Sequence, residues 1–91
     1  MRTKVNNMTS AKGNSIPNQL IITDENGNTL FQSYDSVICK RDKSGNITLD
    51  SNFWDYSKTT GKYRNIFLGE TKAETQAKIN AGVYELVNLN E

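Results

Sequence analysis

The first half of the chain alternates between short runs of apolar and β-branched residues and polar segments that contain glycine. Four such runs lie at residues 19–24, 29–34, 36–41 and 46–50. Runs of this length and composition predict β-strands. The segment at 25–28 contains Asn26-Gly27, which favours a type I′ hairpin turn with positive φ at both central residues. Together with a second turn at 43–46, the pattern predicts an antiparallel meander of three or four strands, with a bend or bulge at residues 34–36.

After residue 60 the apolar period changes to that of a helix. Tyr63, Ile66 and Phe67 lie three and four residues apart, so they share one face of a short helix. Thr59 or Thr60 can cap it, because a threonine oxygen accepts hydrogen bonds from the unpaired N–H groups of a first turn. These residues therefore predict a strand-to-helix junction just before position 60.

Gly69 is in the position where a glycine commonly ends a helix. Thr71 followed by Glu74 is a capping box, which predicts a second helix that runs to about Ala81 and ends at Gly82. The tail VYELVNL alternates and predicts a last strand that can join the sheet of the meander.

These elements predict an α+β fold, in which a small, mainly antiparallel β-meander precedes two short helices and a C-terminal strand. Residues 1–17 are polar and show no clear periodicity. They carry three cations and no acid: Arg2, Lys4 and Lys12. We therefore expect a disordered basic N-terminal arm at 1–17, followed by a single α+β domain at 18–91.

The composition limits the chemistry that the chain can perform. Of its 91 residues 35% are hydrophobic, none is histidine, and Cys39 is the one cysteine. That thiol lies in an apolar strand-like run without a base to activate it. The acids lie in turns, caps and polar faces; three of them could in principle hold a hard metal ion, but lack a recognised spacing: Asp35, Asp50 and Asp55. We expect no enzymatic activity, no metal site and no cofactor.

Charge and hydropathy limit the partners and the cellular compartment that the sequence predicts. The net charge of +1 gives no general electrostatic attraction to nucleic acid. No segment approaches the length of a transmembrane helix, and the N-terminus lacks the apolar core of a signal peptide. The sequence therefore predicts a cytoplasmic protein.

The stretch WDYSKTTGKYR, residues 54–64, concentrates aromatic and cationic side chains. In one interpretation Trp54 and Tyr63 pack into the core, and the cations form the solvent-exposed face of the helix. In the other, cations interleaved with aromatic rings neutralise phosphates and stack bases. For Trp54 the core interpretation is favoured. The candidate binding residues are Tyr56, Lys58, Lys62 and Arg64.

The same stretch carries a motif, Trp-Asp-Tyr-Ser-x-Thr-Thr-x-Lys-Tyr at 54–63, preceded by Ser33-Tyr34 and followed by Phe67-Leu68-Gly69. With this motif, residues 31–89 resemble a family of short phage and mobile-element proteins of uncharacterised function. The resemblance implies no catalytic residues. It implies a setting in which small proteins without catalytic groups often block host machinery.

The leading hypothesis is a non-enzymatic phage or mobile-element protein in the host cell cytoplasm. It would bind a host protein or ribonucleoprotein complex, for example as an anti-CRISPR inhibitor of a defence complex, and the edges of the meander could pair with that partner. One alternative is a single-stranded nucleic-acid-binding protein that uses the four candidate residues. Another is a virion-associated or self-assembling structural protein.

Overall fold

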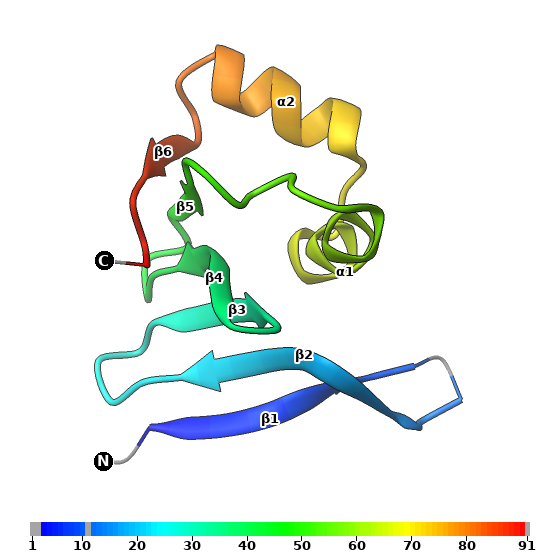
Figure 1. Ribbon diagram of the computed structural model, residues 1–91. Coiled ribbons are helices and arrows are strands. Elements are labelled where there is room, and N and C mark those ends of the chain that lie inside the picture. Colours follow the sequence, from blue (N-terminus) through cyan, green and yellow to red (C-terminus); the bar gives the residue numbers. More distant parts are fainter. Residues whose placement is uncertain (1–2, 11, 91) are drawn as a thin grey trace.

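The computed structural model describes residues 3–10 and 12–90 of the chain (Figure 1). The elements in order are β1 Lys4–Thr9, β2 Ser15–Thr23, β3 Thr29–Ser33, β4 Ser36–Arg41, β5 Ile47–Asp50, α1 Lys58–Leu68, α2 Lys72–Asn80 and β6 Glu85–Val87. They confirm an α+β fold in which a mostly antiparallel meander precedes two helices and a C-terminal strand.

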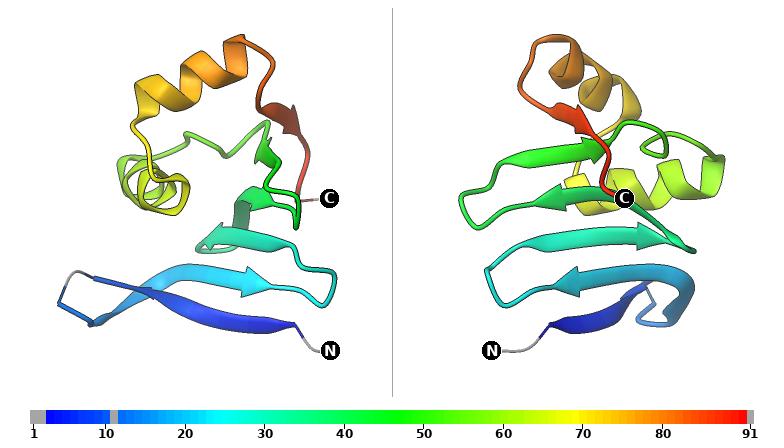
Figure 2. Two further views of the ribbon diagram at one scale, coloured as in Figure 1. Left: turned by 180° about the vertical axis from the view of Figure 1, so that it is seen from behind. Right: turned by 60° about the vertical axis from the view of Figure 1, so that its left-hand side comes forward.

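All six strands form one sheet, in the order in which they occur along the chain. Each neighbouring pair from β1 to β5 is antiparallel, because a short loop turns the chain back after each strand. The strand β6 is parallel to β5, with Leu49 opposite Leu86. A parallel neighbour needs a long crossover, which both helices provide (Figures 1 and 2).

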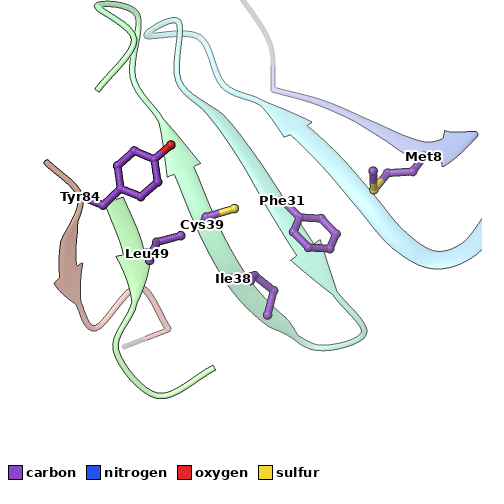
Figure 3. Packing of buried hydrophobic residues seen from close by; sticks show 6 residues of the cluster. All are labelled: Met8, Phe31, Ile38, Cys39, Leu49 and Tyr84. Atoms are coloured by element: carbon purple, nitrogen blue, oxygen red, sulfur yellow. The ribbon is translucent and has the colours of Figure 1, made fainter. Parts of the chain in front are cut away.

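The described part of the N-terminal region is ordered, so the expectation of a disordered arm is wrong for residues 4–9 and 15–17. Strand β1 pairs with β2, and Val5 lies opposite Ile22. Met8, which is 8% exposed, enters the core from this edge strand (Figure 3). Because most of β1 faces solvent, its polar composition is compatible with a strand. Residues 1, 2 and 11, and with them Arg2, lie outside the described residues.

Three of the hairpins close with the same five-residue loop, which has Ser or Asp first, Gly fourth and Asn fifth. The loops lie at residues 10–14, 24–28 and 42–46. In each, the backbone N–H of the first residue donates to the carbonyl of the Asn, at 2.8, 2.9 and 3.0 Å. The first side chain accepts a hydrogen bond from the N–H of the same Asn, at 3.2, 2.9 and 2.9 Å. The glycines have φ of 83°, 86° and 89°, a conformation that favours glycine.

The type I′ turn expected at Asn26-Gly27 is therefore wrong in its details. Gly27 has a positive φ, but Asn26 does not. The reason is Asp24, whose Oδ1 accepts hydrogen bonds from the backbone N–H groups of Asn26 and Asn28, both at 2.9 Å. These bonds hold an Asx-type loop in which three residues, 25–27, lie between the bonded pair Asp24 and Asn28, and not two as in a type I′ turn.

The core lies between α1 and one face of the sheet. In one row across the strands, Phe31 lies opposite Cys39, and Cys39 lies opposite Leu49; all three are fully buried (Figure 3). The ring of Phe31 stacks on that of Phe67 in α1, with centroids 5.9 Å apart. A polar contact joins the same two layers, because the hydroxyls of Ser33 and Thr60 lie 3.0 Å apart in the buried interior.

The caps of the two helices agree only in part with the sequence. Ser57, not Thr59 or Thr60, is the N-cap of α1, and its Oγ accepts a hydrogen bond from the Thr60 N–H at 3.1 Å. The expected glycine cap is confirmed at Gly69, which has φ of 71°. The capping box that begins α2 is also confirmed, with both of its reciprocal hydrogen bonds present.

The C-terminal segment is fastened to the sheet by a buried carboxylate. Asp50, at the end of β5, is 0% exposed. Its Oδ2 accepts hydrogen bonds from the backbone N–H groups of Asn52 and Phe53, and its Oδ1 accepts one from Leu89 at 2.8 Å. A single side chain therefore holds both the turn after β5 and the segment after β6.

Candidate binding site

The four candidate residues line one open depression of about 440 Å³ beside the start of α1. Lys58 and Lys62 lie one turn apart on α1 and are exposed. Tyr56, 49% exposed, precedes the helix, and its ring meets that of Phe53 edge-on. The structure adds Lys72 from the first turn of α2, which the sequence analysis missed. No local pattern could have indicated Lys72, because only the tertiary fold brings the start of α2 beside Asp55, which precedes α1.

Arg64 differs from the other candidates because it is 0% exposed. Its Nη1 donates to the Trp54 carbonyl at 2.7 Å and to Asp55 Oδ1 at 3.1 Å, and its Nη2 donates to Asn65 Oδ1 at 2.9 Å. The guanidinium also lies 5.1 Å from the centre of the Trp54 ring, which packs against the core as expected. Arg64 is therefore part of the floor of the depression and not part of an exposed patch.

One carboxylate, that of Asp55, lies among these cations. Its Oδ1 pairs with Arg64, and its Oδ2 lies 2.7 Å from Lys72 Nζ. Burial raises the pKa of Asp55, but the hydrogen bonds from Lys72 and Arg64 outweigh this effect, so the pKa lies below its ordinary value. Asp55 is thus ionised near neutral pH and compensates only part of the positive charge around the depression.

The charges on the side chains at the start of α1 are unfavourable for the stability of the helix. Lys58 is the first helical residue, and the first turn contains no acid. A cation at the positive end of a helix is unfavourable by about 0.3–1 kcal/mol, and a like-charged pair one turn apart, such as Lys58 and Lys62, by about 0.2–0.5 kcal/mol. Local arrangements that cost stability are found mainly at functional sites.

Cys39 is not among the residues that line this depression. The residue is 0% exposed, and burial raises the pKa of its thiol to about 12, against the lowering effect of Arg64 and Arg41. Across residues 3–10 and 12–90, the structure contains no group of three or more His, Cys, Asp or Glu that could hold a metal ion. In the same part of the chain, none of the helices has the length and apolarity needed to cross a membrane.

We predict that Cys39 does not react with a thiol-specific disulfide reagent in the folded protein at pH 8. The thiolate is the reactive form, and a pKa of about 12 leaves almost none of it at this pH. Absorbance should show modification no faster than unfolding exposes the residue, and complete modification in denaturant. Native-state modification at the rate of a free thiol would contradict the burial of Cys39.

Strand β1 forms one edge of the sheet and pairs only with β2 in the described structure. The hydrogen bond from the Asp24 N–H to the Asn28 carbonyl closes the 24–28 loop and joins the end of β2 to β3. Because backbone groups point alternately to the two sides of an antiparallel strand, this bond determines which groups of β2 face β3 and which face β1. In the register between β1 and β2, the backbone groups of Lys4 and Asn6 then face β2. Those of Val5 and Asn7 point away from the sheet. The N–H and C=O groups of these two residues lie on the same side of β1 and can form hydrogen bonds with another strand.

An apolar strip adjoins this edge on the sheet face that α1 does not cover. The register places Val5 opposite Ile22, and Ile22 opposite Leu30. These positions alternate with the row of Phe31 and Cys39, so they lie on the opposite face of the sheet. Neither described helix lies against this face, and Val5 is 56% exposed (Figure 2).

The fold defines a small α+β domain with one six-stranded, mainly antiparallel sheet and two helices. Residues 3–81 match a family of unknown function (DUF8033), and the chain belongs to that family. Comparisons with curated proteins and with solved structures give no match.

Proposed function

We propose that the chain is a small non-enzymatic binding protein that pairs the open edge of β1 with an extended strand of a partner protein. The observation that carries this proposal is the pair of outward-facing residues Val5 and Asn7, whose N–H and C=O groups can extend the hydrogen-bond ladder. Strand addition of this kind takes affinity from backbone hydrogen bonds and specificity from alternate side chains.

The surface beside β1 supports the same proposal. A strand added there would place alternate side chains against Val5, which is 56% exposed, and near Ile22. Proteins commonly protect an edge strand by making it short or by placing proline in it. Strand β1 has six residues and no proline, whereas β6 at the other end of the sheet has three.

The resemblance of residues 31–89 to phage and mobile-element proteins indicates which partners to test first. We propose a host protein or ribonucleoprotein complex, such as a defence complex that an anti-CRISPR protein inhibits. The burial of the Cys39 thiol supports a role in binding and not in nucleophilic chemistry. Such a protein would act in the host cell cytoplasm.

The test is capture of a partner from host lysate by the chain and by two variants at one position. Val5→Pro removes the outward N–H and should abolish capture, since proline on an edge strand spares the ladder when its N–H faces away from the sheet. Val5→Thr retains both the N–H and a β-branched side chain, so it should capture the partner as the wild type does. Circular dichroism and thermal unfolding would establish that both variants are folded.

The proposal fails if folded Val5→Pro captures the same partner as the wild type at equal stoichiometry. It also fails if the wild type captures no stoichiometric partner at physiological salt. The self-assembly alternative uses the same edge, and light scattering distinguishes the two: the proposal expects a monomer at high concentration. The nucleic-acid alternative is supported by the cations around the depression and not by β1.

A further inference from the structure

The depression beside α1 has the charge arrangement of a site for a phosphate group. Lys58 and Lys62 are exposed, and neither forms an ion pair within residues 3–10 and 12–90. Lys72 faces the same depression and shares Asp55 with Arg64. The first N–H groups of α1 also lack partners within the helix, as at every helix start. An anion bound here would relieve the repulsion that these cations create.

The floor of the depression adds a buried cation to the exposed lysines. Arg64 lines the depression and is fully buried, and its Nε has no hydrogen-bond partner among residues 3–10 and 12–90. A buried donor without a partner is rare in folded proteins. Because water is largely excluded around this guanidinium, its charge acts on the depression with less screening than that of an exposed lysine.

Gly61 leaves a gap above this guanidinium. The residue lies within α1 and does not have a positive φ, so the backbone does not require glycine. A Cβ at this position would meet Arg64 Nη1 and Nη2 at 3.7 Å and Asp55 Oδ1 at 3.8 Å, which are ordinary contacts. Alanine therefore fits and would be the better helix former. The glycine keeps the floor open at the cost of helix propensity.

The size of the depression indicates a ligand larger than phosphate alone. About 440 Å³ is within the range of small-molecule sites, and a phosphate group would fill only a part of it. Tyr56 borders the remainder. The residue is half-exposed, and its ring forms a T-shaped pair with that of Phe53, with centroids 5.6 Å apart. A ring held in this way offers a face on which an aromatic base can stack.

We propose that the depression binds the terminal phosphate of a nucleotide, with Lys58, Lys62 and Lys72 around the phosphate and the base stacked on Tyr56. This site is separate from the β1 edge and does not depend on the proposed protein-binding function. The phosphate is held by positioned cations and by the start of the helix. The proposal involves binding only and no chemical step.

The test is a titration of the full chain with AMP, adenosine and inorganic phosphate at low ionic strength, followed by NMR and calorimetry. AMP should bind saturably and shift the amide signals of Lys58, Gly61 and Lys62. Inorganic phosphate should shift the same signals with weaker affinity, and adenosine should not bind. Higher salt should weaken AMP binding, because the main contacts are between charges.

Two pairs of variants distinguish this site from general electrostatic attraction. Lys58→Glu should weaken AMP binding by at least about tenfold, since it replaces a charge-assisted contact with repulsion. Lys43→Glu makes the same charge change in an exposed loop outside the depression and should have little effect. Gly61→Ala should retain or raise the unfolding temperature while weakening AMP binding. Val5→Pro should bind AMP normally, which separates this proposal from that for β1.

Two oligonucleotides identify the source of the phosphate. Competition by a 5′-phosphorylated strand, but not by its 5′-hydroxyl counterpart, would assign the site to a strand terminus; if neither competes, it would be assigned to a free nucleotide. Both outcomes support the proposal.

The proposed nucleotide site is overturned if AMP shifts no signal around the depression, if adenosine binds as well as AMP, or if the two lysine variants weaken binding equally. Unchanged AMP affinity in Gly61→Ala would refute the role of the gap.

Discussion

Replacing Arg64 with leucine is expected to destabilise the fold by about 2–4 kcal/mol, because hydrogen bonds made by a buried charged group are worth about 1.5–3 kcal/mol each, while Asp55 keeps its second partner, Lys72. The guanidinium makes three hydrogen bonds, to the Trp54 carbonyl, to Asp55 and to the Asn65 side chain. Leucine leaves all three acceptors without this donor and also removes the cation above the Trp54 ring. Since domains of this size are stable by about 5–15 kcal/mol, this loss would be a large fraction of the total stability.

Urea unfolding followed by tryptophan fluorescence would measure this loss. The matched control is Lys62→Leu, which removes an exposed cation from the same helix and relieves its repulsion with Lys58. The free energy of unfolding of the control should change by less than about 0.5 kcal/mol, as for most surface substitutions. If Arg64→Leu and Lys62→Leu unfold at the same urea concentration, the buried pair does not have the structural role described for it.

Replacing Asp50 with asparagine is expected to cost about 2–4 kcal/mol, because hydrogen bonds to a charged acceptor are worth about 1.5–3 kcal/mol each. The two carboxylate oxygens accept from Asn52, Phe53 and Leu89. An amide has only one oxygen, so its NH₂ group must face at least one of these N–H donors. Asp35→Asn, an exposed change in the turn between β3 and β4, is the matched control and should have almost no effect.

The pH dependence gives this prediction a distinctive signature. Burial raises the pKa of Asp50, but hydrogen bonds from Leu89, Phe53 and Asn52 and from the Asn90 side chain outweigh it, so the folded-state pKa lies below the ordinary value. The stabilisation is therefore complete above the unfolded-state pKa of about 3.9, and it is lost as the pH falls through the folded-state pKa. The free energy of unfolding should be measured for wild type and Asp50→Asn from neutral pH into acid. The difference between the two proteins should become smaller below about pH 4. A constant difference would contradict the role of the charge.

The sequence predicts the elements whose signals are local. The capping box of Thr71 and Glu74 and the glycine cap at Gly69 depend on neighbours within one helical turn, and both are confirmed. The strand at 36–41 has its expected bounds, because its apolar residues are bounded by turns on both sides. The α+β class follows from these elements.

The errors concern residues whose environment depends on distant parts of the chain. Strand β1 is polar because one side of it faces solvent, and its pairing with β2 cannot be read from its own residues. The buried residues of α1 are Thr60, Gly61 and Arg64. A helix that buries polar groups shows no apolar stripe at those positions, so the burial of Arg64 could not be predicted from periodicity.

One available signal was missed. The loop with Ser or Asp first, then Gly and Asn in its last two positions, occurs at 10–14, 24–28 and 42–46. The last two copies predict turns, whereas the first lies in a polar segment without clear periodicity, which predicts a disordered arm. Aligning the three copies would have predicted the hairpin of β1 and β2.

This repeated loop also has a consequence for how the chain folds. Each loop closes over five residues, so the entropy lost in joining β1 to β2, β2 to β3 and β4 to β5 is small and these pairs can form early. The parallel pair of β5 and β6 joins residues separated by both helices. During synthesis, β1 to β5 are made before residues 85–90 exist. We therefore expect the slow step of folding to be the docking of the C-terminal segment, when the Asp50 carboxylate gains the Leu89 N–H.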